Sequence, residues 1–134
     1  MKLSMAAELA IRGIVVLSEN YGHGPLPLES ICETRDLPRQ YLVKLFAMLS
    51  RAHLIEAVRG KGGGYALAKP PSEITLLQVV EAIEGPLAIN LCQNVPPRCD
   101  RTQCKVRGVW TELQLHIRDR LGASTLNQFV NAQA

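Results

Sequence analysis

The sequence predicts a mostly α-helical protein with a small β-hairpin wing, that is, a winged helix-turn-helix followed by a long C-terminal helix. Two observations indicate this fold class. The first 70 residues read in order as helix, short helix, helix and hairpin, which is the winged helix-turn-helix order. Near the C-terminus, an amphipathic helix has no obvious partner within the chain. We therefore expect this helix to pack against a second copy and form a homodimer.

The N-terminal region predicts three helices separated by turns. Residues 4–19 carry apolar side chains at helical spacing, and Ser4 is the expected N-cap. Residues 28–35 form a short second helix. Pro38 suits the first turn of a third helix, which ends near Arg51. One face of the third helix is apolar and is expected to be buried, and its members are Tyr41, Leu42, Leu45, Phe46 and Leu49.

The remaining elements follow from glycines, prolines and helical periodicity. Residues 54–68 hold two short apolar segments around a Gly-rich, basic tip, which predicts a β-hairpin. Residues 74–85 form a helix that stops at Gly85. Residues 106–122 form the amphipathic C-terminal helix, and the tail after it adds one turn. The expected dimerisation face of that helix comprises Val109, Trp110, Leu113, Ile117 and Leu121.

Charge and hydropathy limit the function classes. The chain of 134 residues has a net charge of +3, and residues 1–70 hold nine Lys/Arg against six Asp/Glu, whereas the rest holds six of each. This excess permits nucleic-acid binding without demanding it. No apolar stretch is long enough for a signal peptide or a membrane span. We therefore expect a cytoplasmic protein without structural disulfides.

Five polar residues are candidates for contact with a double-stranded DNA operator. Arg39, Gln40 and Lys44 lie on the polar face of the predicted third helix, where Arg can pair with guanine and Gln with adenine. Arg59 and Lys61 lie at the hairpin tip and can reach phosphates or the minor groove. Each residue taken singly also fits an ordinary solvated surface. The order of elements together with the basic Gly-rich tip favours DNA binding.

Three of the four cysteines cluster in one proline-broken stretch. Cys92, Cys99 and Cys104 are spaced C-x6-C-x4-C, and thiolates at such spacing can bind an iron–sulfur cluster. The CxxC pairs typical of zinc ribbons are absent. From the residues alone, a cluster and a set of free or redox-active thiols are equally consistent. Cys32 falls on an apolar helical position and is expected to be a small core residue.

The sequence does not indicate an enzyme. It contains no nucleotide-binding fingerprint and no convincing Ser/His/Asp or Cys/His set. The GKGGG run lacks the GxxxxGK[ST] form of a phosphate-binding loop, and a hairpin tip explains it more simply. We therefore expect no catalytic residues and no small-molecule substrate.

Several motifs together resemble one known family. They are LP-x-x-YL-x-x-LF in the third helix, RGKGGGYALA in the hairpin, ITLLQVVEAIEG, the cysteine triad, VW-x-x-L and TL-x-x-FV. The chain resembles the Rrf-type winged-helix transcription regulators, which include the IscR/NsrR-like iron–sulfur regulators. The resemblance implies a homodimeric regulator whose cluster lies near the dimer interface and senses iron–sulfur status, redox or nitric oxide.

The resemblance also divides the chain by role. It implies a DNA-binding domain at 1–85, a cysteine-rich cluster-binding loop at 86–105, and a dimerisation helix with its tail at 106–134. The [2Fe–2S] form is favoured over [4Fe–4S] because the C-terminal half is more similar to IscR. The alternative function is a cluster-free member of the family, acting as a thiol- or small-molecule-responsive repressor.

The fourth ligand is an open choice. IscR-like proteins have a His three residues after the last Cys, where this chain has Arg107, and a charged guanidinium does not bind metal. Other cluster-binding members use a carboxylate in the first helix, donated by the partner subunit. Glu8 occupies that position here. The competing interpretation is that Glu8 forms an exposed ion pair with Arg12, one helical turn away.

Overall fold

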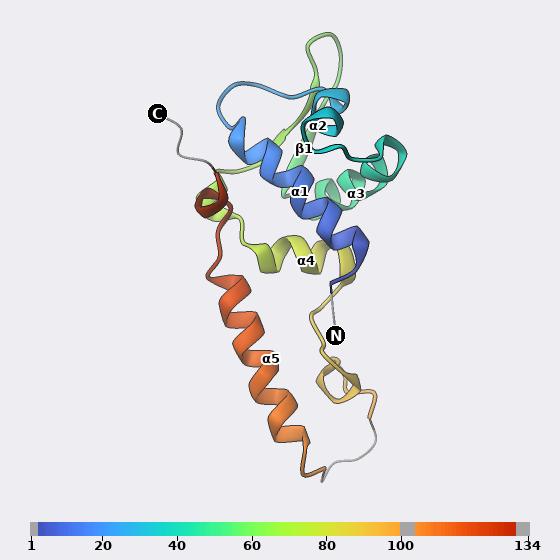
Figure 1. The fold of residues 1–134 in the computed structure, drawn as a ribbon, viewed down its shortest axis with the longest axis vertical. Coiled ribbons are helices and arrows are strands. Elements are labelled where there is room, and N and C mark those ends of the chain that lie inside the picture. The colour runs from blue at the N-terminus through green and yellow to red at the C-terminus, as the bar shows by residue number, and fades with distance from the viewer. Residues whose placement is uncertain (1–2, 100–103, 131–134) are drawn as a thin grey trace.

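A head of packed helices with a two-stranded wing carries one long helix that extends away from it (Figure 1). The computed structural model describes residues 3–99 and 104–130. The helices are α1 (Met5–Glu19), α2 (Leu28–Arg35), α3 (Arg39–Arg51), α4 (Leu76–Glu84) and α5 (Arg107–Gly122), and the strands are β1 (Ile55–Val58) and β2 (Gly64–Leu67). Short 3-10 turns cover Pro71–Glu73, Leu91–Gln93 and Leu126–Phe129. This order confirms the winged helix-turn-helix prediction.

Local signals account for the helix ends, although two of the predicted starts were wrong. Ser4 caps α1, because its Oγ accepts a hydrogen bond from the backbone N–H of Ala7 at 3.1 Å. Thr75 caps α4 and forms a capping box with Gln78, so this helix begins at Leu76 rather than at Ile74. Pro38 is the N-cap of α3 rather than a residue of its first turn. Gly85 ends α4 with a positive φ of 82°, as expected.

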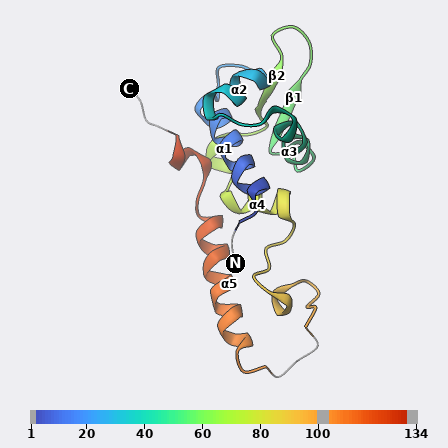
Figure 2. The same ribbon diagram turned by 45° about the vertical axis from the view of Figure 1, so that its right-hand side comes forward.

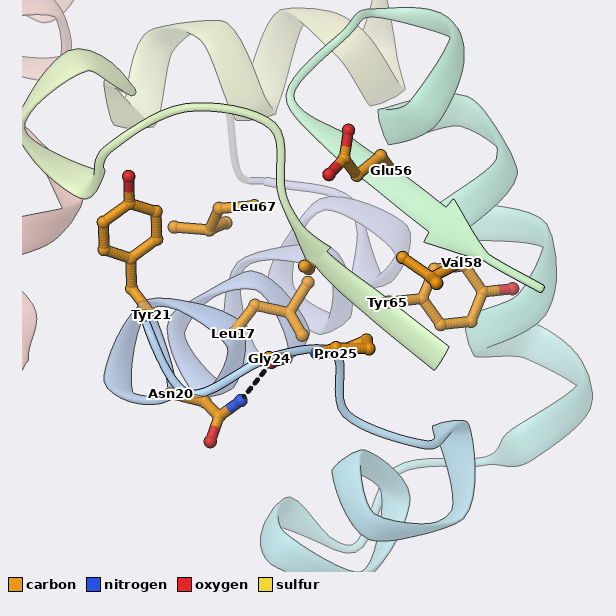
Figure 3. A pocket seen from close by; sticks show the side chains of 11 residues that line it. Leu17, Asn20, Tyr21, Gly24, Pro25, Glu56, Val58, Tyr65 and Leu67 are labelled. Atoms are coloured by element: carbon orange, nitrogen blue, oxygen red, sulfur yellow. Dashed lines mark hydrogen bonds between the residues drawn. The ribbon is translucent and has the colours of Figure 1, made fainter. Parts of the chain in front are cut away.

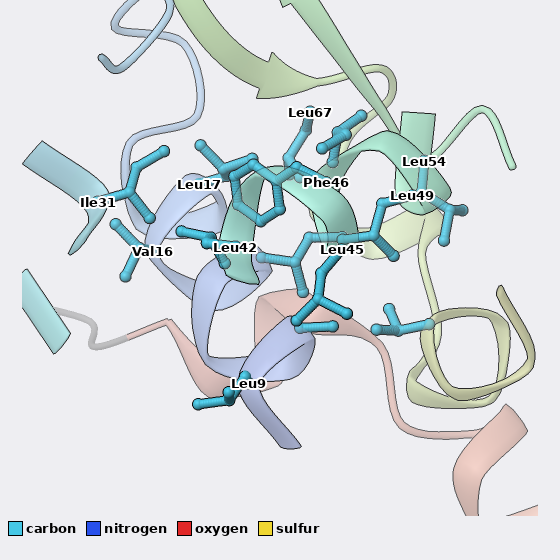
Figure 4. Close-up of a cluster of buried hydrophobic side chains, with 14 of the residues drawn as sticks. Leu9, Val16, Leu17, Ile31, Leu42, Leu45, Phe46, Leu49, Leu54 and Leu67 are labelled. Atoms are coloured by element: carbon cyan, nitrogen blue, oxygen red, sulfur yellow. The ribbon is translucent and has the colours of Figure 1, made fainter. Parts of the chain in front are cut away.

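The hydrophobic core lies between α1, α3 and the base of the wing (Figure 4). The ring of Phe46 meets that of Tyr65 edge to face, with 5.0 Å between ring centroids, and this contact joins α3 to β2. Gly13 on α1 lets the same Phe46 ring approach closely, because a Cβ there would press on the ring. Tyr41 is 38% exposed, contrary to expectation. It lies about 100° around the helix from Leu42, at the edge of the apolar face.

The C-terminal tail returns to the head. Leu126 N–H donates to Ile74 O at 2.9 Å, and Leu76 N–H donates to Ser124 O at 2.8 Å. The Leu126 side chain is fully buried in the core of the head. Residues 131–134 of the predicted tail lie outside the described residues. The end of α5 is therefore anchored to the same core that supports α1 and α3.

The long helix and the cysteine loop lie side by side, below the head, in both views (Figures 1 and 2). The start of α5 is the end farthest from the head, and the Leu91–Gln93 turn of the loop packs against this helix. Within the described part of the chain, no helix combines the length and the apolar character needed to cross a membrane.

Candidate functional site

The exposed side of α3 carries the polar residues that the sequence analysis singled out. Gln40 and Lys44 are exposed and lie roughly opposite Leu42, which is buried against the core. Arg39 is also exposed and stands in the first turn of α3, beside α2. The three side chains are therefore free to contact a ligand that approaches α3 from outside.

Arg39 is held by an acidic residue of the preceding helix. Its Nε donates to Glu29 Oε1 at 3.1 Å, and both side chains are 61% exposed. The pKa of the Glu29 carboxyl lies below its ordinary value, first because of a hydrogen bond from its own backbone N–H and then because of the Arg39 hydrogen bond. Glu29 therefore orients Arg39 while leaving its remaining N–H donors open.

The wing is a β-hairpin whose base is fixed and whose tip projects. β1 and β2 pair antiparallel from Ile55 opposite Leu67 to Val58 opposite Gly64. Arg59 and Lys61 stand at the exposed tip. A Cβ at Gly64 would collide with the backbone carbonyl that precedes α2, because this backbone pairs with β2. The glycine therefore allows the close contact that ties the wing to the helices.

A hollow of about 210 Å³ lies at the base of the wing, between the end of α1, the turn after it and the two strands (Figure 3). The turn is closed by Asn20, whose Nδ2 donates to Gly24 O at 2.8 Å. Glu56 is the one charged side chain in the lining, and it is exposed. The lining of this hollow therefore contains no cluster of charged side chains.

The three clustered cysteines line one cavity. Cys92, Cys99 and Cys104 share a hollow of about 230 Å³ beside the first turn of α5. All three are half-buried and unpaired, so no disulfide competes for their sulfur atoms. Arg107 and Trp110 of α5 complete much of the wall. The fold therefore brings together the thiols that the sequence spacing had grouped.

Hydrogen bonds from glutamine side chains hold the cavity against α5. Gln114 Oε1 accepts from Ile89 N–H at 2.8 Å, and its Nε2 donates to Leu87 O at 3.0 Å. Gln93 Nε2 lies 3.2 Å from Cys92 Sγ and 3.0 Å from Thr111 Oγ1. Sequence reasoning missed these residues, because no spacing rule links positions 93 and 114 before the loop is folded.

The fourth-ligand candidates occupy different places. Arg107 lines the cysteine cavity, and its guanidinium makes no ion pair within residues 3–99 and 104–130. Glu8 is exposed on α1 and lines a separate hollow with Glu84. Nor does Glu8 pair with Arg12 in this part of the chain. Within this chain the Glu8 carboxylate and the three thiols therefore line different hollows.

Metal-binding geometry is not preformed for a single ion. Among the described residues, no group of three or more His, Cys, Asp or Glu side chains is arranged to hold a metal ion. Cys32 stands apart on α2, packed at the edge of the core, and its burial raises the pKa of its thiol. This cysteine is thus a structural residue, as expected.

The apolar face of α5 is open in the single subunit. No residue of this helix is buried. Val109 is 53% and Leu113 40% exposed, while Trp110, Ile117 and Leu121 are half-buried. The last two also line an apolar groove with Leu3 and residues 87–89. An exposed apolar face of this length is typical of a surface that another chain covers.

Comparison with solved structures gives the class of the protein. B. subtilis CymR, described as the global cysteine regulator, superposes with a TM-score of 0.86 at 25% identity and covers 100% of this chain and 99% of its own. T. potens IscR superposes with a TM-score of 0.79 at 29% identity and covers 96% of this chain and 85% of its own. The protein is thus a winged-helix transcription regulator.

The family follows from sequence. The Rrf2 model, described as an iron-dependent transcriptional regulator, matches residues 3–132. The HTH-type transcriptional regulator IscR of Photorhabdus laumondii is 30% identical over 133 residues, which is 99% of this chain and 81% of the relative. The chain belongs to the Rrf2 family of transcriptional regulators. Since its relatives are regulators, the expectation that it is not an enzyme is confirmed.

Proposed function

We propose that this protein is a cytoplasmic, homodimeric transcription regulator whose DNA binding depends on an iron–sulfur cluster. The observation that carries the proposal is the convergence of Cys92, Cys99 and Cys104 on one cavity. Residues 1–85 would read the operator, 86–105 would hold the cluster, and 106–134 would form the dimer. Similarity to two IscR proteins supports the cluster part of this assignment.

The DNA-binding part rests on exposed donors carried by two rigid elements. In the proposed complex α3 enters the major groove, where Arg39 and Gln40 face base edges and Lys44 faces phosphate. Arg59 and Lys61 follow the backbone or the minor groove from the wing tip. Two copies related by a two-fold axis present two such heads, which suits a two-fold operator.

The donor set of the cavity fits a cluster better than a single ion. Thiolates are the usual ligands of iron–sulfur clusters, and a cluster spreads its ligands over several iron atoms. The cysteines therefore do not need the tight spacing of one ion's coordination shell, which they lack. When bound, the cluster supplies a one-electron redox centre that oxygen or nitric oxide can attack. Arg107 adds a positive charge to the wall of this thiolate-rich site.

Glu8 of the second subunit is the proposed fourth ligand. In its own chain it is exposed and lines a hollow with Glu84 rather than the cysteine cavity. The open apolar face of α5, with Val109 and Leu113, is the proposed contact that brings the second copy close. Since α1 packs in the core beside α3, a ligand on α1 would couple the cluster to the reading helix.

The decisive experiment is a UV–visible spectrum of protein purified without oxygen, with iron and sulfide counted per chain. Visible bands with about two of each establish the [2Fe–2S] form that we favour, and about four of each establish [4Fe–4S]. Operator affinity is then measured by fluorescence anisotropy with and without the cluster. A colourless protein whose DNA binding ignores iron overturns the cluster function.

A second function is favoured by one observation. B. subtilis CymR, a cysteine regulator, shares the fold over the whole chain, and so does S. aureus CymR, which has been solved in an oxidized form. The same three half-buried thiols would then act without metal, as a thiol- or small-molecule-responsive repressor. This alternative predicts colourless protein whose operator binding changes with oxidation of the cysteines rather than with iron.

A further inference from the structure

We propose that Gln93 is a positioning residue that donates an N–H hydrogen bond to Cys92 Sγ and thereby raises the reduction potential of the bound cluster. The inference rests on the proposed cluster function, and it names one residue that would tune the reduction potential of that cluster. Its basis is the contact of 3.2 Å between Gln93 Nε2 and Cys92 Sγ, on consecutive residues of the Leu91–Gln93 turn.

The NH2 end of the Gln93 amide faces the Cys92 sulfur. Thr111 Oγ1 donates its single proton to Arg107 O at 3.0 Å. Toward Gln93 the hydroxyl can then only accept, so the group that it contacts at 3.0 Å is the amide NH2. The second N–H of the same NH2 group is left for Cys92 Sγ. The assignment of donor and acceptor thus follows from the bonds of Thr111.

Side chains of α5 hold this donor in place. The Gln93 backbone carbonyl accepts from Gln114 Nε2 at 3.4 Å, and Gln114 also binds the backbone at 87 and 89. Both Thr111 and Gln114 project from α5, one turn or less apart. The helix therefore fixes the main chain and the side chain of Gln93 together, which preorganises its N–H toward the sulfur.

A hydrogen bond to Cys92 Sγ would change the reduction potential of a cluster bound there. Hydrogen bonds to ligand sulfur are among the groups that set cluster potentials. An N–H donor draws negative charge from the thiolate and so favours the reduced, more negative state. In a titration, one electron passes from dithionite to the cluster, and no bond of the protein is made or broken. Gln93 acts through Cys92 and is not itself a ligand.

The test compares the reduction potentials of clusters reconstituted in the full-length protein. Gln93→Leu removes the donor, and Gln93→Glu sets an oxygen against the sulfur. We expect Gln93→Leu to lower the ratio of reduced to oxidised cluster about tenfold at a fixed potential, which is about 59 mV for one electron. Gln93→Glu should lower it further. A potential equal to that of wild type in both variants overturns the inference.

Two substitutions of Thr111 form a matched pair of test variants. Thr111→Val keeps the shape but loses the acceptor that orients the amide, so its potential should fall, whereas Thr111→Ser should keep the wild-type value. Asn94→Ala is the loop control, because Asn94 binds the backbone at 90 and 91 without touching sulfur. If Gln93→Leu merely loses cluster while the remainder keeps its potential, Gln93 is structural only. A wild-type protein that takes up no cluster refutes the proposed function instead.

Discussion

Arg39 and Glu29 join the two helices of the helix-turn-helix, with 3.1 Å between Arg39 Nε and Glu29 Oε1. The pair is exposed, so solvent weakens it and an incoming ligand can compete for the guanidinium. Glu29 binds only Nε, and the terminal nitrogens of Arg39 stay available. Such a side chain is held in place before DNA arrives and keeps the donors that recognise guanine.

Replacement of Arg39 is the first prediction. Arg39→Ala should weaken binding to the specific operator by about tenfold to a hundredfold, since a bidentate base contact contributes roughly 1–3 kcal/mol of discrimination. Lys61→Ala should instead weaken binding to all sequences alike and reduce the salt dependence, because it removes a phosphate contact. Fluorescence anisotropy with specific and random duplexes at several salt concentrations measures both effects.

The control for this prediction is Arg118→Ala. It removes the same charge from α5, a helix that lies away from α3 and the wing (Figure 1). There Arg118 pairs with Glu81 of α4 at 3.0 Å. Its operator affinity should stay close to wild type. Equal losses in Arg39→Ala and Arg118→Ala would mean that only net charge matters and that α3 does not read bases.

The lowered pKa of Glu29 predicts a pH dependence. A carboxyl whose pKa is lower in the folded state binds fewer protons when folded, so it stabilises the fold above its ordinary value of 4.5. This contribution is lost as pH falls through the lowered pKa. Glu29→Gln should thus be less stable than wild type at pH 7, and the difference should vanish in strong acid. Urea unfolding at both pH values checks this, and a difference that grows in acid contradicts it.

The open face of α5 predicts how the dimer can be broken. Leu113→Glu places a charge in the proposed interface and should yield monomers in sedimentation-velocity runs. Leu115→Glu is the matched control, because Leu115 is 55% exposed and lies about 200° around the helix from Leu113. A dimer that survives Leu113→Glu, or is lost equally in both variants, contradicts the assigned face.

The sequence-based predictions agree with the structure where the signal is local, and they miss features that depend on long-range contacts. Ser4 and Gly85 act within one helical turn, so their roles follow from neighbours in the chain. Gln114 binds a loop more than twenty residues earlier, and its partners are backbone groups that carry no residue signature. The same holds for Leu126, whose apolar character fits a tail helix as well as a core position.

Burial of Leu126 predicts that the tail stabilises the head. Leu126→Ala should lower the free energy of unfolding by about 2–5 kcal/mol, since it leaves a cavity in a fully buried site. Phe129→Ala, at a side chain that is 41% exposed in the same turn, should lower the free energy of unfolding clearly less. Urea denaturation of the two variants separates them. Equal losses would mean that the tail does not pack on the core in solution.

The cysteine loop could be grouped from sequence, but its fourth ligand could not. The short spacing predicts that Cys92, Cys99 and Cys104 lie together, because one loop can fold around a common centre and bring all three side chains to it. No spacing rule reaches from Glu8 to this loop, particularly if two subunits take part. Position 107 is nevertheless suited to an engineered fourth ligand, since Arg107 lines the cavity together with the three thiols.

Exchange of ligands between these positions is the last prediction. Glu8→Ala should lose most of its iron and sulfide, because only three protein ligands remain. Arg107→His adds an imidazole nitrogen that can bind iron, which the guanidinium cannot. The double variant Glu8→Ala/Arg107→His should therefore regain cluster, whereas Glu8→Ala/Arg107→Ala should not. Iron and sulfide counts measure this. Full cluster content in Glu8→Ala alone would exclude the carboxylate as ligand and leave the fourth position to another group.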